Sequence, residues 1–334
     1  MIHIGILGAG TWGIALARML LNQGYSITVW SAIENEVEEY SNTRRHKNLP
    51  GMVIPNGIEF TTEIKRACIN KDVILFAVPS VFVRSTARNT ADYIKNGQVI
   101  VDVAKGLEPG SLYTMTQVID EELRAKNIVA QLVALSGPTH AEEVAKDMPT
   151  TIVAASSDIV SAEYIQNVFM NDFMRVYTNT DVLGVELCGA LKNVIALAVG
   201  ASQGLGYGDN TKAALITRGM AEITRLGIAM GCDVQTFAGL AGIGDLIITA
   251  TSVHSRNNKV GYLIGQGKSV SEAIAEVGMV VEGINALTAA LELKQKYRIE
   301  MPIVEAVDAV VNKGIDASTV VALLMGRSKK SEIV

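Results

Sequence analysis

Short apolar runs alternate with amphipathic helical patterns along the first half of the chain. The apolar runs have the length of strands, and the segments between them repeat apolar residues at helical spacing. This alternation is typical of a parallel sheet that is covered by helices on both faces. We expect strands over 3–7, 26–30, 73–77, 99–103, 128–135, 151–154 and 173–177, and helices over 11–23, 34–40, 81–93, 111–125 and 162–170.

Helical patterns dominate after about residue 180, with long segments over 181–203 and 210–230. The length of 334 residues favours two domains rather than one. We therefore predict an α/β chain whose N-terminal domain, over 1–180, is Rossmann-like and doubly wound. An all-α domain over 181–334 follows it and carries the substrate-binding and catalytic residues.

Composition and charge argue against several classes of protein. The formal net charge is −5 and both signs are spread along the chain, whereas a general nucleic-acid binder would more often be basic. We find no run of about 18 or more apolar residues that predicts a membrane span, and no signal-peptide pattern at the N-terminus. The three cysteines have the spacing of neither a disulfide framework nor a zinc site. We expect a cytoplasmic protein that binds neither nucleic acid nor a metal.

A glycine-rich loop, Gly8-Ala-Gly10-Thr-Trp-Gly13, lies between the first expected strand and the first expected helix. This is the G-x-G-x-x-G pattern of dinucleotide-binding loops, and its position makes that interpretation specific. Gly8 permits the tight turn, Gly10 leaves room for a pyrophosphate at the helix N-terminus, and Gly13 lets the helix pack closely on the strand. We expect NAD or NADP as the cofactor; the alternative is a tight turn without a ligand.

The choice between NAD and NADP stays open at this point. An acid at the end of the second strand favours NAD, because its carboxylate binds the ribose 2′-hydroxyl. Here the strand ends in WSA over 30–32, and the first acid after it is Glu34. The 2′-phosphate of NADP would need cations, and the stretch RRHK over 44–47 offers some, unless it is simply a solvated loop.

Lys192 lies in a segment of small and apolar residues, ELCGALKNVIALAVG over 186–200, which predicts a helix. At about 100° per residue, the lysine shares one face with small side chains and an amide, while mostly larger apolar side chains lie opposite. The lysine's face holds Gly189, Asn193, Ala196 and Gly200, and the opposite face holds Leu187, Leu191, Val194 and Ala198. Small residues around a long cation leave room for a ligand or for another backbone.

A lysine that is partly buried can exchange a proton near neutral pH, which a ketone reductase needs beside the carbonyl oxygen. The alternative is that Lys192 extends to solvent or pairs with a buried acid. The small-residue face favours the first interpretation, because a face turned to solvent would carry more charge.

Other polar residues lie at expected strand ends. Lys105 follows the strand over 99–103, at the edge of the sheet where ligands bind in such folds. Gly137, Thr139 and His140 lie in a turn after the strand over 128–135, where backbone N–H groups could hold an anion. A single histidine in such a loop is more often structural or exposed.

Three further clusters lie at expected helix starts. Arg256, between Ser255 and Asn257, could hold a phosphate through two parallel hydrogen bonds. The alternative for this stretch is a capped, exposed turn. Asp245 could bind a ligand or cap a helix, and Glu282 could do no more than stabilise the first turn of its helix.

Taken together, these segments resemble the NAD(P)-dependent glycerol-3-phosphate dehydrogenase family of bacterial type. The matching stretches span nearly the whole chain, in order GAGTWG, VPS, AKGLE, SGPT, GVELCGALKNVIA, GLGYGDN, ALITRG, AGIGDL, SRNNKVG and VVEG. The lysine helix and the SRN triplet are the most specific. Two departures are mild: His140 stands where an aromatic residue is common, and Ser31-Ala32 lack the basic residue that many members carry.

The resemblance implies a reversible hydride transfer between NAD(P)H and dihydroxyacetone phosphate, which gives sn-glycerol 3-phosphate for phospholipid synthesis. It also implies a homodimer. Lys192 would be the catalytic proton donor to the ketone, and Asn193 would help to orient the oxygen. The substrate would be bound by Lys105, Gly137, Thr139, Asp245, Ser255, Arg256 and Asn257. The cofactor would be contacted by Gly8, Gly10, Thr11, Trp12, Gly13, Lys105, Ala141, Arg256, Val280 and Glu282.

Two alternatives remain. Another two-domain dehydrogenase, acting on a 3-hydroxy acid or a sugar nucleotide, would also carry a lysine on its interdomain helix. A carboxylate substrate would not especially require the cluster over 255–257, and a sugar-nucleotide oxidation would need a nucleophilic cysteine, for which Cys188 is poorly placed on the helix. The second alternative is a dinucleotide sensor without catalysis, against which Lys192 and Arg256 argue.

Overall fold

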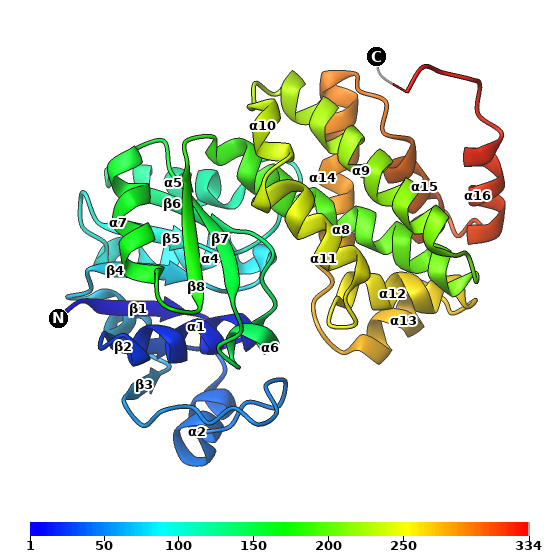
Figure 1. The fold of residues 1–334 in the computed structure, drawn as a ribbon. Coiled ribbons are helices and arrows are strands. Elements are labelled where there is room, and N and C mark those ends of the chain that lie inside the picture. The colour runs from blue at the N-terminus through cyan, green and yellow to red at the C-terminus, as the bar shows by residue number, and fades with distance from the viewer. Residues whose placement is uncertain (333–334) are drawn as a thin grey trace. The chain divides into compact units, whose positions relative to one another are not determined.

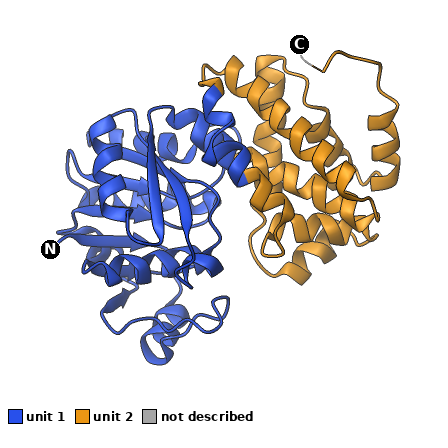
Figure 2. Cartoon of the chain, in the orientation of Figure 1, with its two compact units in different colours: residues 1–189, 235–245 blue, residues 190–234, 246–334 orange. Residues whose placement is uncertain are grey.

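The structure is a computed structural model that describes residues 1–332 and divides into two compact units (Figure 2). Unit 1 comprises Met1–Gly189 and Gln235–Asp245, and unit 2 comprises Ala190–Val234 and the residues from Leu246 on. Helix α8 (Val182–Gly204) begins in unit 1 and continues into unit 2, as does α11 (Asp245–Thr251). The division at residue 180 stays a prediction of domain organisation.

Unit 1 is built on a sheet whose described strands have the order β3-β2-β1-β4-β5-β6-β7-β8. The strands are β1 (His3–Leu7), β2 (Ser26–Trp30), β3 (Ile58–Thr61), β4 (Val73–Phe76), β5 (Val99–Asp102), β6 (Gln131–Ser136), β7 (Thr150–Ala155) and β8 (Met174–Asn179). All neighbours pair in parallel except β6 and β7. The expected Rossmann-like, doubly wound architecture is confirmed, with one antiparallel step where the connection holds only the short helix α6 (Ala141–Val144).

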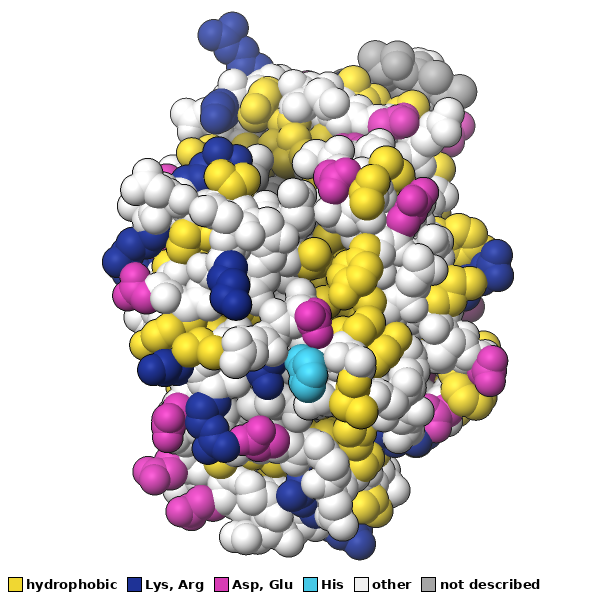
Figure 3. Space-filling model, turned by 90° about the vertical axis from the view of Figure 1, so that its left-hand side faces the viewer, with side chains coloured by type: hydrophobic (Ala, Val, Ile, Leu, Met, Phe, Trp, Pro, Cys, Tyr) yellow, Lys and Arg dark blue, Asp and Glu magenta, His cyan; other side chains and the backbone are white. Residues whose placement is uncertain are grey.

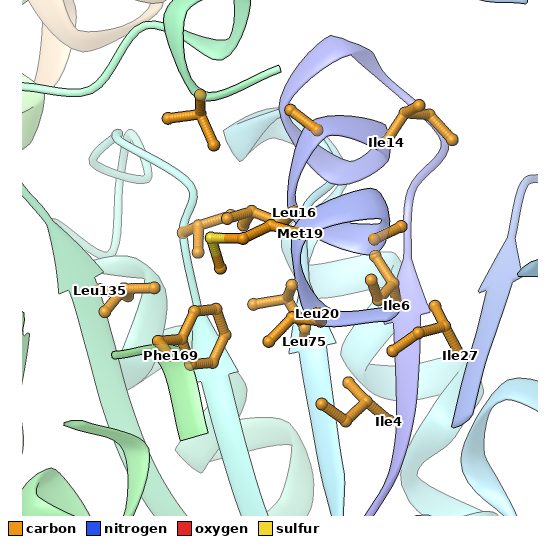
Figure 4. Close-up of a cluster of buried hydrophobic side chains, with 14 of the residues drawn as sticks. Ile4, Ile6, Ile14, Leu16, Met19, Leu20, Ile27, Leu75, Leu135 and Phe169 are labelled. Carbon is orange, nitrogen blue, oxygen red and sulfur yellow. The ribbon is translucent and has the colours of Figure 1, made fainter. Parts of the chain in front are cut away.

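Helices cover both faces of this sheet (Figure 1). One face packs on α1 (Thr11–Asn22) and α7 (Ile159–Phe169), and the other packs on α4 (Ser80–Thr90) and α5 (Met115–Arg124). Because successive strand side chains point to opposite faces, strands buried on both sides are apolar almost throughout. Figure 4 shows side chains of the first cluster, in which Ile4, Ile6, Ile27 and Leu75 of the strands lie near Leu16 and Leu20 of α1 and Phe169 of α7.

Two elements between residues 44 and 72 were not expected from the sequence. These are β3 and the helix α3 (Ile64–Cys68), which lie between α2 (Glu34–Thr43) and β4. Strand β3 has four residues at the edge of the sheet and includes the exposed Glu59, so it lacks an apolar run.

The boundaries of several elements differ from the expected ones by a few residues. Helix α5 begins at Met115 rather than at 111, because Thr114 is its N-cap and forms a capping box with Gln117. Strand β6 begins at Gln131 rather than at 128. The helix expected over 81–93 is α4 followed by a short 3₁₀ turn, η1 (Ala91–Tyr93).

The described residues of unit 2 form helices, as expected for the second half of the chain. They are most of α8 and α11, together with α9 (Asp209–Ala229), α12 (Arg256–Gly265), α13 (Val270–Val277), α14 (Glu282–Tyr297), α15 (Pro302–Val311) and α16 (Ala317–Met325). The segment 235–245 returns to unit 1 with most of α10 (Val234–Phe237) and the π-helical turn η2 (Leu240–Gly244).

Helices α8 and α12 pack with their backbones in close contact. A Cβ atom on Gly200 would lie 2.0 Å from the carbonyl oxygen of Asn258, and one on Gly261 would lie 2.1 Å from that of Leu197. No side chain fits at either position. Gly200 belongs to the small-residue face that carries Lys192, so this end of the face contacts another backbone rather than a ligand.

Two stretches are long and apolar enough to cross a membrane by length and composition alone, Val182–Gly204 and Val234–Thr251. The first is 83% buried inside the protein, as a core helix is, and the second is interrupted by non-helical backbone at Gly242. One face of the molecule shows positive and negative side chains interspersed (Figure 3). The two apolar stretches are therefore weak grounds for a membrane span.

Candidate active site

The glycine-rich loop forms a tight connection between β1 and α1. Gly8 has a φ of +123°, which glycine adopts readily, and its N–H donates to the carbonyl oxygen of Trp30 at 2.9 Å. A Cβ on Gly13 would lie 2.2 Å from the Gly8 oxygen, so α1 approaches the loop closely. Gly10 has open space where a Cβ would stand, and it is the N-cap of α1. The backbone geometry at the three glycines agrees with the predicted turn, open space and close packing, and pyrophosphate binding stays a prediction.

Thr11 and Trp12 are the first two residues of α1. The Thr11 hydroxyl lies 3.4 Å from the side-chain amide of Asn48, which donates to it. The loop after α2 therefore reaches the glycine-rich loop through Asn48. Sequence reasoning did not single out Asn48, because nothing in its local pattern indicates a contact with residue 11.

Unit 1 brings together three residues that were predicted to bind substrate. The Nζ of Lys105 lies 2.7 Å from a carboxylate oxygen of Asp245 and donates to the carbonyl oxygen of Gly137 at 3.0 Å. The Asp245 side chain is 1% exposed and that of Lys105 is 19% exposed. Asp245 is the first residue of α11 rather than the residue before it, and its carboxylate is engaged with a cation.

The turn after β6 packs beside this ion pair. The Thr139 hydroxyl donates to the Gly137 oxygen at 3.2 Å, and Ala141 begins α6 as a buried residue. His140 is the N-cap position of α6, and its side chain makes no capping hydrogen bond.

Gly189 of α8 faces the same group of residues in unit 1. A Cβ on Gly189 would lie 3.2 Å from the Ser136 hydroxyl and 3.5 Å from Cγ of Lys105. A larger residue at 189 would displace the lysine stem. Gly189, which belongs to the predicted small-residue face of α8, thus leaves room for the side chain of Lys105. Ser136 itself was missed, since a serine at a strand end carries no distinctive pattern.

Lys192 lies in unit 2 and is 4% exposed. Its Nζ donates to the hydroxyl oxygen of Thr249 on α11 at 2.6 Å. Thr249 was also missed, although a signal existed: it stands four residues after Asp245, and residues at this spacing share a helix face. The alternative in which Lys192 extends to solvent is excluded by its burial.

Asn193 and Asn257 form a chain of amides in unit 2. The side-chain amide of Asn257 donates to the Asn193 side-chain oxygen at 3.0 Å, and its own oxygen accepts from the N–H of Gly283 at 2.9 Å. Both asparagines are buried. This chain connects α8, α12 and the first turn of α14, so the two amides also hold the helices together.

The SRN triplet opens α12. The Ser255 hydroxyl accepts from the N–H of Asn258 at 3.2 Å, which is an N-cap, and Ser255 is 5% exposed. Arg256 is exposed, and its Nη1 donates to the carbonyl oxygen of Val280 at 3.1 Å. Two residues predicted to contact the cofactor, Arg256 and Val280, are therefore in direct contact. Glu282 is the first residue of α14, where its charge also suits the helix.

A buried acid on α8 supports the loop that carries Lys105. Glu186 accepts from the Thr114 hydroxyl at 2.7 Å and from the Thr116 N–H at 2.8 Å, and burial raises the pKa of its carboxyl group. Thr114 in turn forms a β-bridge with Leu107, two residues after Lys105. Glu186 therefore anchors both ends of the 107–114 turn to α8. Glu186 was not predicted as a site residue, because its partners lie about 70 residues away in the sequence.

Family models match most of the chain. The model of the NAD-dependent glycerol-3-phosphate dehydrogenase N-terminus matches residues 3–162, and that of the C-terminus matches residues 181–322.

Individual relatives match over nearly the full length. The Lactobacillus delbrueckii subsp. bulgaricus protein named glycerol-3-phosphate dehydrogenase (NAD(P)+) 2 is 67% identical over 335 residues, covering 100% of this chain and 99% of its own. A glycerol-3-phosphate dehydrogenase (NAD(P)+) of Fusobacterium nucleatum is 52% identical over 334 residues, covering 100% and 99%. The crystal structure of glycerol-3-phosphate dehydrogenase from Coxiella burnetii has a TM-score of 0.93 and 34% identity, covering 98% and 99%.

A ketopantoate reductase from Ralstonia eutropha shares the fold alone. Its TM-score is 0.62 at 15% identity, covering 93% of this chain and 98% of its own.

Proposed function

Because the chain belongs to the NAD-dependent glycerol-3-phosphate dehydrogenase family, we propose that it catalyses the reversible reduction of dihydroxyacetone phosphate to sn-glycerol 3-phosphate. NAD(P)H supplies a hydride to the keto carbon when it is bound, and a protein group supplies a proton to the keto oxygen. The observation that carries the proposal is the buried Lys192 on the small-residue face of α8.

The connection from β1 to α1 fits a dinucleotide. Gly10 has open space beside it at the N-terminus of α1, where a pyrophosphate would accept backbone hydrogen bonds. Thr11 and Trp12 would contact the cofactor from the first turn of that helix. Lys105 and Ala141 in unit 1 would contact it too, as would Arg256, Val280 and Glu282 in unit 2.

Lys192 is proposed as the catalytic acid. Negative charge builds on the keto oxygen during reduction, and an ammonium group beside it stabilises that charge and then transfers a proton. The hydrogen bond that Lys192 donates to the Thr249 hydroxyl holds its Nζ in place. In the oxidation direction the neutral amine accepts the proton from the substrate hydroxyl.

Lys105 and Asp245 are proposed to bind substrate as a pair. The carboxylate holds the lysine in place, and the lysine adds positive potential at the edge of the sheet. Gly137 and Thr139 would line the same place in unit 1. Arg256 would hold the phosphate, and Ser255 and Asn257 would support the turn that presents it. Binding the non-reacting phosphate positions the keto carbon for reaction.

We further propose that the protein acts in the cytoplasm as a homodimer and supplies glycerol 3-phosphate for phospholipid synthesis. Relatives named glycerol-3-phosphate dehydrogenase support the supply of this metabolite, and the cytoplasmic location and the homodimer are what the resemblance implies. The oligomeric state is tested by the mass of the purified protein in solution.

A single assay tests the reaction. Purified protein is mixed with dihydroxyacetone phosphate and either NADH or NADPH, and the loss of reduced-cofactor absorbance is followed. We expect turnover with at least one cofactor. Absence of turnover with both would remove the proposal, and turnover instead with a 3-keto acid or a sugar nucleotide would favour another two-domain dehydrogenase.

A further inference from the structure

The structure places an acid near the end of β2, although no acid stands at that point in the sequence. The hydroxyl of Ser31, the residue that follows β2, donates to a carboxylate oxygen of Glu36 at 2.7 Å. The Ser31 oxygen also accepts from the N–H of Ile33 at 3.1 Å. Ser31 is buried, so its hydroxyl is a fixed anchor. Glu36, in the first turn of α2, is thereby turned back toward the carboxyl end of β2.

This carboxylate is held at a strand end that contacts the glycine-rich loop. The N–H of Gly8 donates to the carbonyl oxygen of Trp30, the last residue of β2, and Ser31 comes directly after Trp30. The N–H of Ser31 donates to the carbonyl oxygen of Thr61 at 3.1 Å, which fixes the backbone at this point. In dinucleotide-binding folds the adenosine ribose lies at the end of this strand, where an acid accepts a hydrogen bond from the 2′-hydroxyl.

In the cationic stretch over 44–47, Arg44 and His46 make contacts within unit 1. Arg44 donates to the carbonyl oxygen of Ile58 at 2.9 Å, and its guanidinium carbon lies 5.6 Å from the centre of the Phe60 ring. His46 is buried against Tyr40, with the ring centres 5.2 Å apart, and accepts from the N–H of Asn48.

Burial lowers the pKa of His46, so this ring is uncharged at neutral pH. Arg45 and Lys47 are exposed. Of the stretch over 44–47, Arg45 and Lys47 are therefore the two exposed cations.

We propose that Glu36, held by Ser31, is the residue that sets cofactor specificity and makes the protein prefer NAD(H) to NADP(H). This rests on the proposed binding of a nicotinamide dinucleotide at the glycine-rich loop. The carboxylate accepts a hydrogen bond from the ribose 2′-hydroxyl. A 2′-phosphate at the same place brings about two negative charges against it and lacks the hydroxyl donor.

The test is the binding of NADH and of NADPH, each measured as a dissociation constant by titration without substrate. We expect the wild-type protein to bind NADH at least about tenfold more tightly than NADPH. In Glu36→Gln the amide still accepts from the 2′-hydroxyl and from Ser31, so NADH binding is retained. NADPH binding tightens, and the preference falls by about fivefold or more.

Four further variants serve as comparisons for Glu36→Gln. Ser31→Ala releases Glu36 and shifts the preference in the same direction by a smaller factor. Glu38→Gln removes an exposed acid from the same helix and leaves the preference unchanged. Arg45→Gln and Lys47→Gln leave NADH binding unchanged.

Three results would overturn the assignment: equal or tighter binding of NADPH by the wild type, an unchanged preference in Glu36→Gln, or an equal shift in Glu38→Gln. Failure of the proposed reaction gives a different result. A protein that binds NADH but does not turn over dihydroxyacetone phosphate refutes the reaction, while its two dissociation constants still decide the role of Glu36.

Discussion

Lys105 and Asp245 form an ion pair of 2.7 Å although 140 residues separate them, and the carboxylate side chain is 1% exposed. Removing two charges from water is costly, so such a pair is weak grounds for stability. The lysine also donates to the Gly137 oxygen, and Gly189 leaves room for its stem. We infer that the pair fixes the direction of the Lys105 ammonium group.

The first prediction concerns Asp245→Asn, which keeps the shape of the side chain and removes its charge. Lys105 then loses the carboxylate that compensates it, and the free energy of unfolding should fall by about 2–4 kcal/mol. The effect is smaller than for a fully buried pair, because Lys105 is partly exposed. Because the lysine is also misdirected, kcat/KM should fall by about tenfold or more. Urea unfolding and steady-state kinetics measure the two effects.

The matched control for this variant is Asp92→Asn. It removes an exposed partner of Lys126 in the same unit and should change stability by less than about 1 kcal/mol. Equal effects of the two substitutions on stability and activity would show that the buried pair has no special role.

The second prediction concerns Lys192→Met, which keeps most of the length of the side chain and removes the ammonium group. We expect kcat to fall by about 100- to 10,000-fold, with NADH binding and the folded structure retained. Thr249→Val removes the hydroxyl that accepts from Nζ and should lower kcat by a smaller factor. Lys296→Met changes an exposed lysine of α14 and should have no effect. Near-normal kcat in Lys192→Met would refute its role as the acid.

Sequence patterns were sufficient for the features that depend on near neighbours. The order of the strands and helices follows from apolar periodicity except at β3 and α3, and the turn at Gly8 follows from a glycine pattern whose context is local. The face of α8 that carries Lys192 was also readable from helical spacing. What the pattern left open was which group each small residue faces: Gly189 faces Lys105, whereas Gly200 faces the backbone of α12.

The contacts that complete the candidate site depend on the path of the backbone and were not predictable. The pairing of Lys105 with Asp245 requires the segment 235–245 to return to unit 1, which no local pattern indicates. The contact of Glu36 with Ser31 was not predictable either, although the two residues are close in the sequence. It stands five residues after Ser31, a spacing with no secondary-structure meaning, and it meets Ser31 only because the chain turns between β2 and α2.

The third prediction concerns Arg256→Gln. The exposed guanidinium is proposed to bind the substrate phosphate, so the KM for dihydroxyacetone phosphate should rise by about tenfold or more with a smaller change in kcat. Inorganic phosphate should also become a weaker competitive inhibitor. Lys259→Gln, an exposed cation on the same helix, is the control and should leave KM unchanged. A KM in Arg256→Gln equal to that of the control would count against phosphate binding.

The last prediction concerns the pH dependence of stability, through Glu222 of α9. Its carboxylate oxygens accept from the N–H groups of Ile303 and Val304 in the first turn of α15, at 2.8 and 3.3 Å. Burial, the main cause, raises the pKa of Glu222 to about 7 from 4.5. The folded state therefore retains this proton at a pH where the unfolded chain has released it. The resulting stabilisation is complete below about pH 4.5 and is lost as the pH rises through 7.

Glu222→Gln cannot ionise but can still accept a hydrogen bond from α15. The free energy of unfolding of the wild type, minus that of Glu222→Gln, should therefore fall by up to roughly 3 kcal/mol between pH 5 and 8. Urea unfolding at the two pH values measures it. The exposed acid variant Glu38→Gln should show a difference that is nearly constant with pH. If the difference for Glu222→Gln is equally constant, or rises with pH, then the carboxyl group of Glu222 does not hold a proton in the folded state.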